Sequence, residues 1–369
     1  MTQGASLPRL APAIGLFFLA PLTAEYLMGN VPITHVQNMI GLAPLYGGGA
    51  LLIREFARRT GRGWPTMMTL ALAYGMIEEA YVTQTLWDSN WMVGAHTLEY
   101  GFIPALGLAG PWTMFMVGVH TVFSISAPIA IAETLAGSRR TTPWLGKLGL
   151  TITGVLYAVV ALGAGIAQAV YGNHASTSQL IGAAVVIAAI IVVGVRLPRH
   201  TTDLTLLPGH APSPWVAGAL AMASGAVFVL LYAVDPTGFT PWLAEAITLP
   251  AWLSVIIYLA LFVTTATVVV RWSHRAGWSQ AHRLALAGGA MLTYAWHSFP
   301  QRTITPIVPP TPPASLAEDL TSNAVLTAGA VALLVVAALR LRQPSATGAG
   351  SAATEDDNSH ANRPGERRV

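Results

Sequence analysis

The sequence predicts an all-α, polytopic transmembrane helix bundle of about ten spans. Of the 369 residues, 53% are hydrophobic and only 9% are charged, whereas soluble domains carry about 25% charged residues. The mean hydropathy is +0.56, and apolar windows long enough to cross a bilayer recur along the chain. This composition excludes a soluble protein. The net charge of +3 does not indicate a nucleic-acid partner, because the distribution of the basic residues follows the membrane topology; we expect no nucleic-acid partner.

Ten apolar windows of spanning length define a ten-span transmembrane domain at residues 1–342. In chain order they are Leu10–Gly29, Val36–Ile53, Pro65–Leu86, Pro111–Leu135, Leu148–Tyr171, Gln179–Leu197, Trp215–Val234, Pro250–Val270, Leu284–Gln301 and Thr321–Leu339. The first window carries Glu25 and Tyr26 where a signal peptide would carry a cleavage site, so we interpret it as a retained span. Residues 343–369 are polar and of low complexity, which predicts a disordered cytoplasmic tail.

The basic residues set the orientation of these spans. With a cytoplasmic N-terminus, every Lys and Arg except Arg302 falls in a cytoplasmic segment, as the positive-inside rule requires. Both termini are then cytoplasmic. Lys147 is the only lysine, and Arg, Ala and Gly are used heavily, which is typical of a GC-rich bacterial genome. We therefore expect a multipass protein of the bacterial plasma (inner) membrane, with the lipid bilayer as its surroundings.

The second, third and fourth spans contain residues that apolar packing does not require. The glycine run Gly47–Gly49 in the second span predicts a close contact between helices. Glu78 and Glu79 lie in the third span, and His120 lies in the fourth. An ionised carboxylate near the bilayer centre costs roughly 2.5–3.5 kcal/mol, and Leu or Ala would fill the same volume without that cost. The glutamate pair therefore indicates a functional site.

Glu78, Glu79 and His120 are predicted to lie at a similar depth in the membrane. At 1.5 Å per residue, Glu78 and Glu79 lie roughly 11 Å below the outer end of their span, and His120 roughly 13 Å. Glu79 shares a helix face with Thr83, and His120 with Ser124, because each pair is spaced i, i+4. Glu78 is rotated by about 100° from Glu79 on an α-helix, so we expect it at the edge of the same site.

Other intramembrane polar residues have simpler interpretations. Glu133 lies near the cytoplasmic end of its span, where we expect it to pair with Arg139 or Arg140. Glu25 lies near a span end and is expected to be solvated. His297 lies close to the outer interface, where its simplest role is that of an interfacial residue.

The chemistry of the polar residues suggests a metal or a proton as ligand. Cysteine is absent, so a metal ion must be held by nitrogen and oxygen ligands, which suit Zn²⁺. We predict Glu78, Glu79 and His120 as catalytic residues, with Glu79, His120 and His297 as metal ligands. One glutamate would act as general base toward a metal-bound water. The alternative is that the carboxyl groups are protonated and hydrogen-bonded within the bundle.

A segment rich in aromatic residues, Trp87–Gly110, connects the third and fourth spans on the outer side. Its four large aromatic side chains are typical of a segment that lies on the membrane interface. Because it passes above the predicted site, it is either a lid or docking segment for a substrate, or an interfacial anchor.

The run IEEAYVTQ, with His120 and His297 on later spans, resembles the CAAX-processing and bacteriocin-processing (CPBP) intramembrane protease family. That family carries an EExxxR motif, then FxxxH, then a further histidine. By this resemblance Glu78 and Glu79 match the glutamate pair, His120 the second motif and His297 the last. Thr83 stands at the arginine position, and Phe115 lies five residues before His120 instead of four. The resemblance implies a metal-dependent hydrolase that cleaves a membrane-embedded peptide.

The run from APLTAEYLMGN through GGGALLIREFARRTGRGWP to the glutamate pair resembles uncharacterised actinobacterial membrane proteins, which implies no activity. Three functions therefore stay open: an intramembrane hydrolase, a proton- or cation-coupled transporter of a small molecule, and a non-catalytic membrane partner subunit. The intramembrane acids lie in the first half of the chain only, and the halves show no self-similarity, which disfavours a transporter built from inverted repeats. Substrate and oligomeric state are not predicted.

Overall fold

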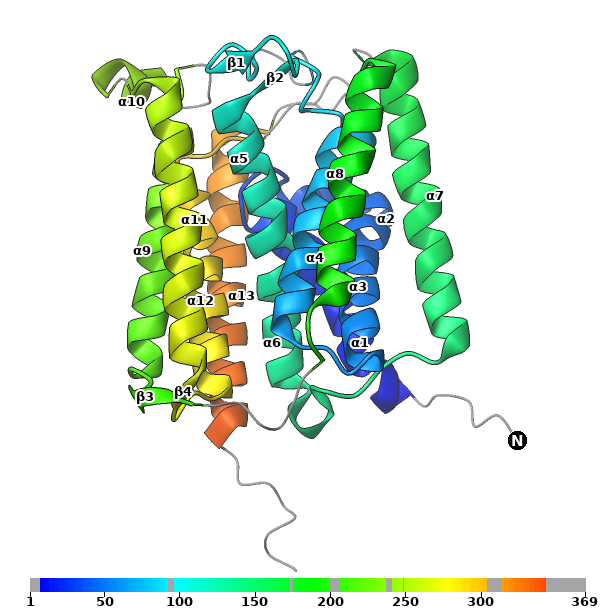
Figure 1. Ribbon diagram of the computed structural model, residues 1–369, viewed down its shortest axis with the longest axis vertical. Coiled ribbons are helices and arrows are strands. Elements are labelled where there is room, and N and C mark those ends of the chain that lie inside the picture. Colours follow the sequence, from blue (N-terminus) through cyan, green and yellow to red (C-terminus); the bar gives the residue numbers. More distant parts are fainter. Residues whose placement is uncertain are drawn as a thin grey trace, which may run out of the picture.

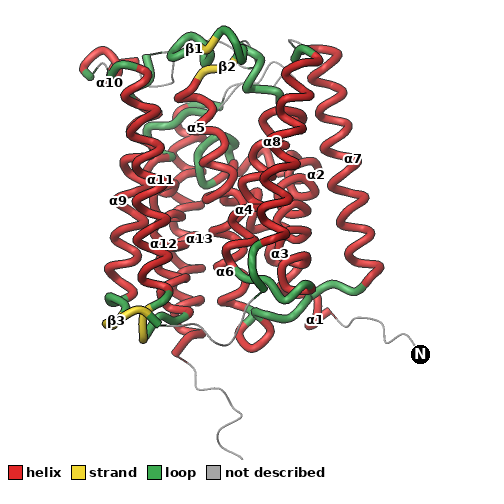
Figure 2. Tube along the Cα trace, in the orientation of Figure 1, coloured by secondary structure: helices red, strands yellow, loops and turns green. Residues whose placement is uncertain are grey.

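The computed structural model describes residues 7–89, 91, 96–172, 175–199, 206–236, 241–247, 249–303 and 314–342. Within these residues the chain is a bundle of upright helices (Figures 1 and 2), which confirms the predicted all-α polytopic fold. Two small sheets cap its ends: β1 (Phe102–Ile103) pairs antiparallel with β2 (Leu108–Ala109), and β3 (Leu207–His210) pairs parallel with β4 (Arg275–Ala276). The predicted tail 343–369 lies outside the described residues.

Ten helical segments of the described chain coincide with the ten predicted windows. They are α1 (Leu7–Pro21) with η1 (Leu22–Tyr26); η2 (Ile33–Asn38), α2 (Met39–Leu42), η3 (Ala43–Gly47) and α3 (Gly48–Arg59); α4 (Trp64–Ile77) with η4 (Glu78–Val82); α5 (Gly110–Gly118), η5 (Val119–Ser126) and α6 (Ala127–Leu135); α7 (Lys147–Tyr171); α8 (Thr177–Arg196); α9 (Pro214–Ala233); α11 (Ala251–Ser273); α12 (Gln280–His297); and α13 (Leu316–Arg342). Two short helices, η6 (Gly137–Arg139) and α10 (Pro241–Ala246), lie between them.

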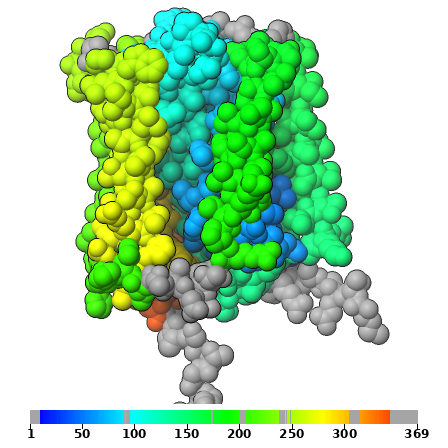
Figure 3. All heavy atoms as spheres, viewed as in Figure 1, coloured from blue at the N-terminus to red at the C-terminus, as the bar shows by residue number. Residues whose placement is uncertain are grey.

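Seven of the described helices are long and apolar enough to cross a membrane. The other three segments, α1–η1, α4–η4 and α12, carry several of the buried polar side chains. The outer helices α7, α11 and α13 bury only 6%, 11% and 11% of their apolar windows, so their exposed side chains suit contact with lipid. In Figure 3, α7 and α8 (green) and the α9–α11 region (yellow-green) form the flanks of the visible surface.

The helix α1 begins and α13 ends at the same end of the bundle, which we call the terminal face (Figure 1). The opposite end carries residues 83–89, 91 and 96–109 and is called the loop face. The first and last described helices thus begin and end on one side, as an even number of spans predicts. The assignment of the terminal face to the cytoplasm rests on the positive-inside rule and stays a prediction.

Each glycine of the run Gly47–Gly49 faces a different helix. A Cβ atom on Gly47 would lie 2.0 Å from the carbonyl oxygen of Phe17 in α1, and one on Gly49 would lie 2.3 Å from the ring of Tyr74 in α4. A Cβ atom on Gly48 would lie 3.3 Å from Tyr157 in α7. The predicted close contact is confirmed, and it holds three neighbouring helices against the second span.

Four π-helical turns interrupt the first four spans: η1, η3, η4 and η5. Three of them lie next to prolines, because η1 follows Pro21, η3 contains Pro44 and η5 ends two residues before Pro128. A proline inside a helix removes one N–H donor and clashes with the carbonyl group of residue i−4; for Pro128 that residue is Ser124, inside η5. π turns occur frequently at functional sites.

A buried ion network joins the second and fourth spans at the terminal face. The guanidinium group of Arg58 donates to both carboxylate oxygens of Glu133, at 2.7 and 2.6 Å, and Arg54 Nε donates to Glu133 at 3.2 Å. Arg54 also donates to Glu55 at 2.7 Å. The prediction that Glu133 pairs with Arg139 or Arg140 is wrong: the neighbouring span supplies its partners, and Arg140 contributes its carbonyl oxygen to Arg54 instead.

Candidate functional site

The predicted residues Glu78, Glu79 and His120 meet inside the bundle. His120 Nε2 lies 2.6 Å from Glu79 Oε1, and His120 Nδ1 lies 3.2 Å from Glu78 Oε2. The two glutamates are each 1% exposed and His120 is 4% exposed. The imidazole ring therefore lies between two carboxylates, with one ring nitrogen facing each of them, in a region that solvent does not reach. This arrangement confirms the expected match in depth.

Hydroxyl groups complete the hydrogen bonding of Glu79 and His120. Thr85 donates to Glu79 Oε2, and Thr83 lies at 3.5 Å from the same oxygen. Ser124 Oγ lies 3.4 Å from His120 Nδ1. The i, i+4 partners Thr83 and Ser124 are thus on the predicted faces, but the closest hydroxyl partner of Glu79 comes from Thr85, beyond the end of η4.

Glu78 has a different environment from Glu79. Among the described residues, none donates a well-aligned hydrogen bond to either of its carboxylate oxygens. The phenol groups of Tyr46 and Tyr74 lie beside it, and the hydroxyl group of Tyr74 has no described hydrogen-bond partner either. A buried carboxylate without donors is costly, so Glu78 is poised to take up a proton or a cation.

Local helix geometry explains how both glutamates reach one ring. A π turn closed by i to i+5 hydrogen bonds holds more residues than an α turn, so the side chains of Glu78 and Glu79 in η4 diverge by less than 100°. The expectation that Glu78 lies only at the edge of the site is therefore wrong. Gly75, one α-helical turn earlier, lets the fourth span approach, because a Cβ atom there would lie 3.1 Å from His120 Cβ and from the carbonyl oxygen of Val117.

Glu25 and Tyr46 extend the buried cluster toward the loop face. Tyr46 donates to Glu25 Oε1 at 2.5 Å, and Asn30 Nδ2 donates to Glu25 Oε2 at 3.0 Å. The ring of Tyr46 also stacks on His120, with centroids 5.8 Å apart and planes 25° apart. Glu25 is half-buried instead of solvated. Each of the four π turns thus supplies at least one ionisable or aromatic member of the cluster, and η4 supplies both Glu78 and Glu79.

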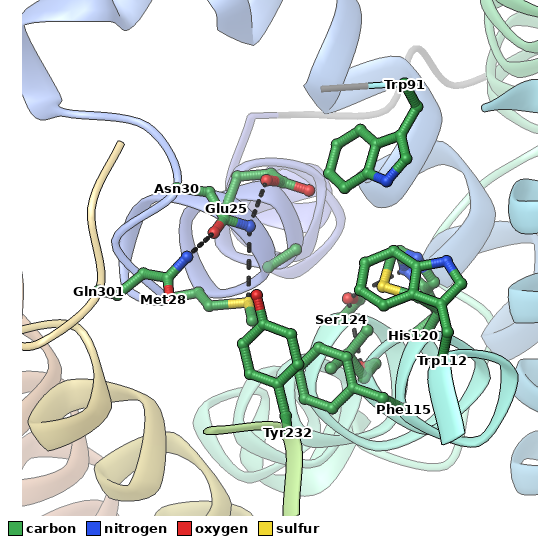
Figure 4. A pocket seen from close by; sticks show the side chains of 13 residues that line it. Glu25, Met28, Asn30, Trp91, Trp112, Phe115, His120, Ser124, Tyr232 and Gln301 are labelled. Carbon is green, nitrogen blue, oxygen red and sulfur yellow. Dashed lines mark hydrogen bonds between the residues drawn. The ribbon is translucent and has the colours of Figure 1, made fainter. Parts of the chain in front are cut away.

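A cavity of ≈ 50 Å³ lies between Glu25 and His120. Figure 4 shows Glu25 and Asn30 on one side and the rings of Trp112, Phe115 and Tyr232 on the other. Trp91, from the predicted lid segment Trp87–Gly110, also lines the cavity. Residues 90 and 92–95 of that segment lie outside the described residues. Because a water molecule needs about 10–15 Å³ of such space, the cavity has room for a few water-sized molecules.

His297 lies apart from the three central residues. Its ring contacts Tyr232 and Trp296, with centroid distances of 6.4 and 6.1 Å, and its Nε2 atom has no described hydrogen-bond partner. In the described part of the chain, no group of three or more His, Asp or Glu side chains is arranged to hold a metal ion. Both nitrogens of His120 face carboxylates. The arrangement therefore does not fit the predicted zinc site, and the metal roles of Glu79, His120 and His297 stay predictions.

Sequence reasoning missed several residues of the cluster. Tyr46 and Tyr74 are ordinary aromatic residues in apolar spans, and Asn30 and Gln301 lie at span ends where polar residues are common. Gln301 Nε2 lies 3.3 Å from Asn30 Oδ1, which joins the ends of the first and ninth spans. The one sequence feature that could have pointed to these additional residues was Glu25, an acidic residue inside the first predicted span.

Comparison with known proteins gives a family without an assigned activity. Residues 16–345 match the model of a family described as "Uncharacterized membrane protein family". No curated protein matches the chain, and no solved structure matches it.

Proposed function

The chain belongs to this uncharacterized membrane protein family, and from its buried site we propose that it is a proton-coupled membrane transporter. In this proposal Glu78, His120 and Glu79 together bind and release a proton. The supporting observation is the imidazole ring held between two carboxylates, at 2.6 and 3.2 Å, inside a membrane-spanning bundle. Chains of Glu, Asp and His within membrane spans are typical of proton relays.

Charge balance gives the site its affinity for protons. A protonated His120 between two ionised glutamates leaves a net charge of −1, and Glu25, the fourth ionisable group of the cluster, makes the balance more negative. Uncompensated charge in a low-dielectric interior costs several kcal/mol. A bound proton or cation removes that cost, and its release requires contact with water. In the proposed transport cycle, the site binds a proton or cation while it is open to one side of the membrane and releases it while it is open to the other side.

The two ends of the bundle differ in a way that suits alternating exposure. The cavity lies toward the loop face, whereas the network of Arg54, Arg58 and Glu133 closes the second and fourth spans at the terminal face. These two spans also carry Tyr46 and His120. A rearrangement that separates them at the terminal face would connect the proton site to the opposite side of the membrane.

A hydrolase is the second candidate, and one observation favours it. Glu79 and His120 form a tight pair, as expected of a general base and its orienting partner, and His120 shares its cavity with the side-chain amides of Asn30 and Gln301. The cavity of ≈ 50 Å³ does not hold a peptide segment, which is why we rank this function, the CPBP-like activity, below transport.

The test is proton flux in liposomes that contain the full chain. A membrane potential is imposed with K⁺ and valinomycin, and an enclosed pH-sensitive dye reports the lumenal pH. We compare the wild type with Glu79→Gln and with Glu99→Gln, a matched control because the Glu99 side chain is 67% exposed. Losing a hydrogen bond to a charged group costs about 1.5–3 kcal/mol, so we expect Glu79→Gln to slow the flux by about tenfold or more.

Two results would contradict the proposal. Equal flux in the wild type, in Glu79→Gln and in empty liposomes excludes proton transport through this site. About one zinc ion per wild-type chain, lost in Glu79→Gln and in His120→Ala, would favour the hydrolase instead. A wild-type chain that carries protons and holds no stoichiometric metal supports the transporter.

A further inference from the structure

We propose that the cavity beside Glu25 binds a small primary ammonium cation as the transported substrate, an inference that rests on the transport function proposed above. The cavity combines three features that such a cation requires: an uncompensated carboxylate, a wall of aromatic rings, and the side-chain amide oxygens of Asn30 and Gln301.

The carboxylate of Glu25 provides the charge. Its two hydrogen-bond donors, the hydroxyl group of Tyr46 and the amide of Asn30, are both neutral. None of the thirteen described residues that line the cavity is Lys or Arg. The other ionisable lining residue, His120, directs both ring nitrogens at Glu78 and Glu79, which balance its charge. A negative potential therefore remains in a low-dielectric cavity and attracts cations.

The aromatic wall favours an organic cation over an alkali metal ion. Phe115 stacks on Tyr232 with centroids 4.0 Å apart, and Trp112 lies 6.2 and 6.4 Å from these two rings. Trp91 lies 5.8 Å from Trp112. Ring faces attract ammonium groups through their quadrupoles, and aromatic cages are a common way to bind such groups. Rings do not replace the oxygen shell of a small hydrated metal ion.

The hydrogen-bond acceptors and the size of the cavity restrict further which organic cations it can bind. A primary ammonium group has three N–H donors, which match the carboxylate of Glu25 and the side-chain oxygens of Asn30 and Gln301. A quaternary ammonium group has no N–H donor and would add no hydrogen bond to these acceptors. The cavity of ≈ 50 Å³ has room for a few water-sized molecules, which suits methylammonium but not a large amine.

The experiment measures binding of methylammonium chloride to the detergent-purified full chain by isothermal titration calorimetry. Potassium chloride and tetramethylammonium chloride at equal ionic strength serve as comparison cations. Glu25→Gln removes the charge with little change of shape, Glu25→Asp retains the charge, and Glu99→Gln is the matched control at the same face. Thermal unfolding of each variant shows whether it is folded.

We expect saturable methylammonium binding in the wild type and in Glu99→Gln, weakened by about tenfold or more in Glu25→Gln. Glu25→Asp should retain most of the affinity. The inference is overturned if the wild type shows no saturable binding, if Glu25→Gln binds as tightly as the wild type, or if K⁺ or tetramethylammonium binds equally well. Glu79-dependent proton flux without methylammonium binding refutes this inference alone. Methylammonium binding without Glu79-dependent proton flux refutes the proposed function, and the cavity is then a cation-binding site without transport.

Discussion

Replacing Glu133 by Gln should destabilise the folded chain by an amount that can be worked out from the ion network at the terminal face. The carboxylate is fully buried and accepts three hydrogen bonds, from Arg58 Nε and Nη2 at 2.7 and 2.6 Å and from Arg54 Nε at 3.2 Å. The neutral amide leaves Arg58, 6% exposed, without a buried counter-charge. Removing one partner of a buried ion pair costs about 3–5 kcal/mol. Arg54 keeps its ion pair with Glu55, at 2.7 Å. We therefore expect the unfolding free energy to fall by an amount near the lower end of this range, about 3 kcal/mol.

The assay is denaturant-induced unfolding in detergent, followed by tryptophan fluorescence. Glu99→Gln makes the same chemical change at an exposed position and should alter the unfolding free energy by less than about 0.5 kcal/mol. Adding Arg58→Gln to Glu133→Gln should recover part of the loss, with a coupling of about 0.5–3 kcal/mol. A Glu133→Gln variant as stable as Glu99→Gln would refute the reasoning, because the network would then contribute nothing to folding.

Three further predictions concern the packing and the polar site. Gly47→Ala should destabilise the chain by about 1–3 kcal/mol, because the new Cβ atom would clash with the carbonyl oxygen of Phe17. Gly41→Ala is the control and should leave the stability unchanged, because a Cβ atom there would have no neighbour within 4 Å. Equal melting temperatures of the two variants would contradict this prediction. His297→Phe should leave proton flux unchanged, because no described contact joins His297 to Glu78, Glu79 or His120; a loss of flux would return His297 to the site. Thr85→Val should slow proton flux more than Thr83→Val does, because Thr85 makes the closer contact with Glu79; the reverse order would show that Thr83 orients the carboxylate.

The sequence was sufficient for the bundle and for the centre of the site. Apolar windows identify spans because the bilayer requires every backbone group to be satisfied within a helix. The glutamate pair and His120 stood out because their cost inside a bilayer is large. Their meeting followed from equal depth in consecutive spans, and the contact at 2.6 Å confirms it.

The rest of the cluster depended on geometry that sequence patterns do not carry. The π turns change the direction of side chains within a span, so a rotation of 100° per residue placed Glu78 wrongly. The partners of Glu133 are Arg54 and Arg58, some 75 residues earlier in the chain. From the sequence we instead expected Arg139 or Arg140, because they are close to Glu133 in the chain. Glu25 was interpreted as solvated because the contacts of Tyr46 and Asn30 with its carboxylate arise only in the folded bundle.

The most direct test of the central claim is infrared difference spectroscopy of the purified protein between acidic and alkaline pH. We predict a carboxylic acid C=O component that appears reversibly at acidic pH and shifts in D₂O. This band is absent from the double variant Glu78→Gln, Glu79→Gln, in which the other carboxyl groups of the chain still give their own bands. The Glu99→Gln control should keep the band. An unchanged band in the double variant would contradict the claim that this glutamate pair and His120 hold the exchangeable proton.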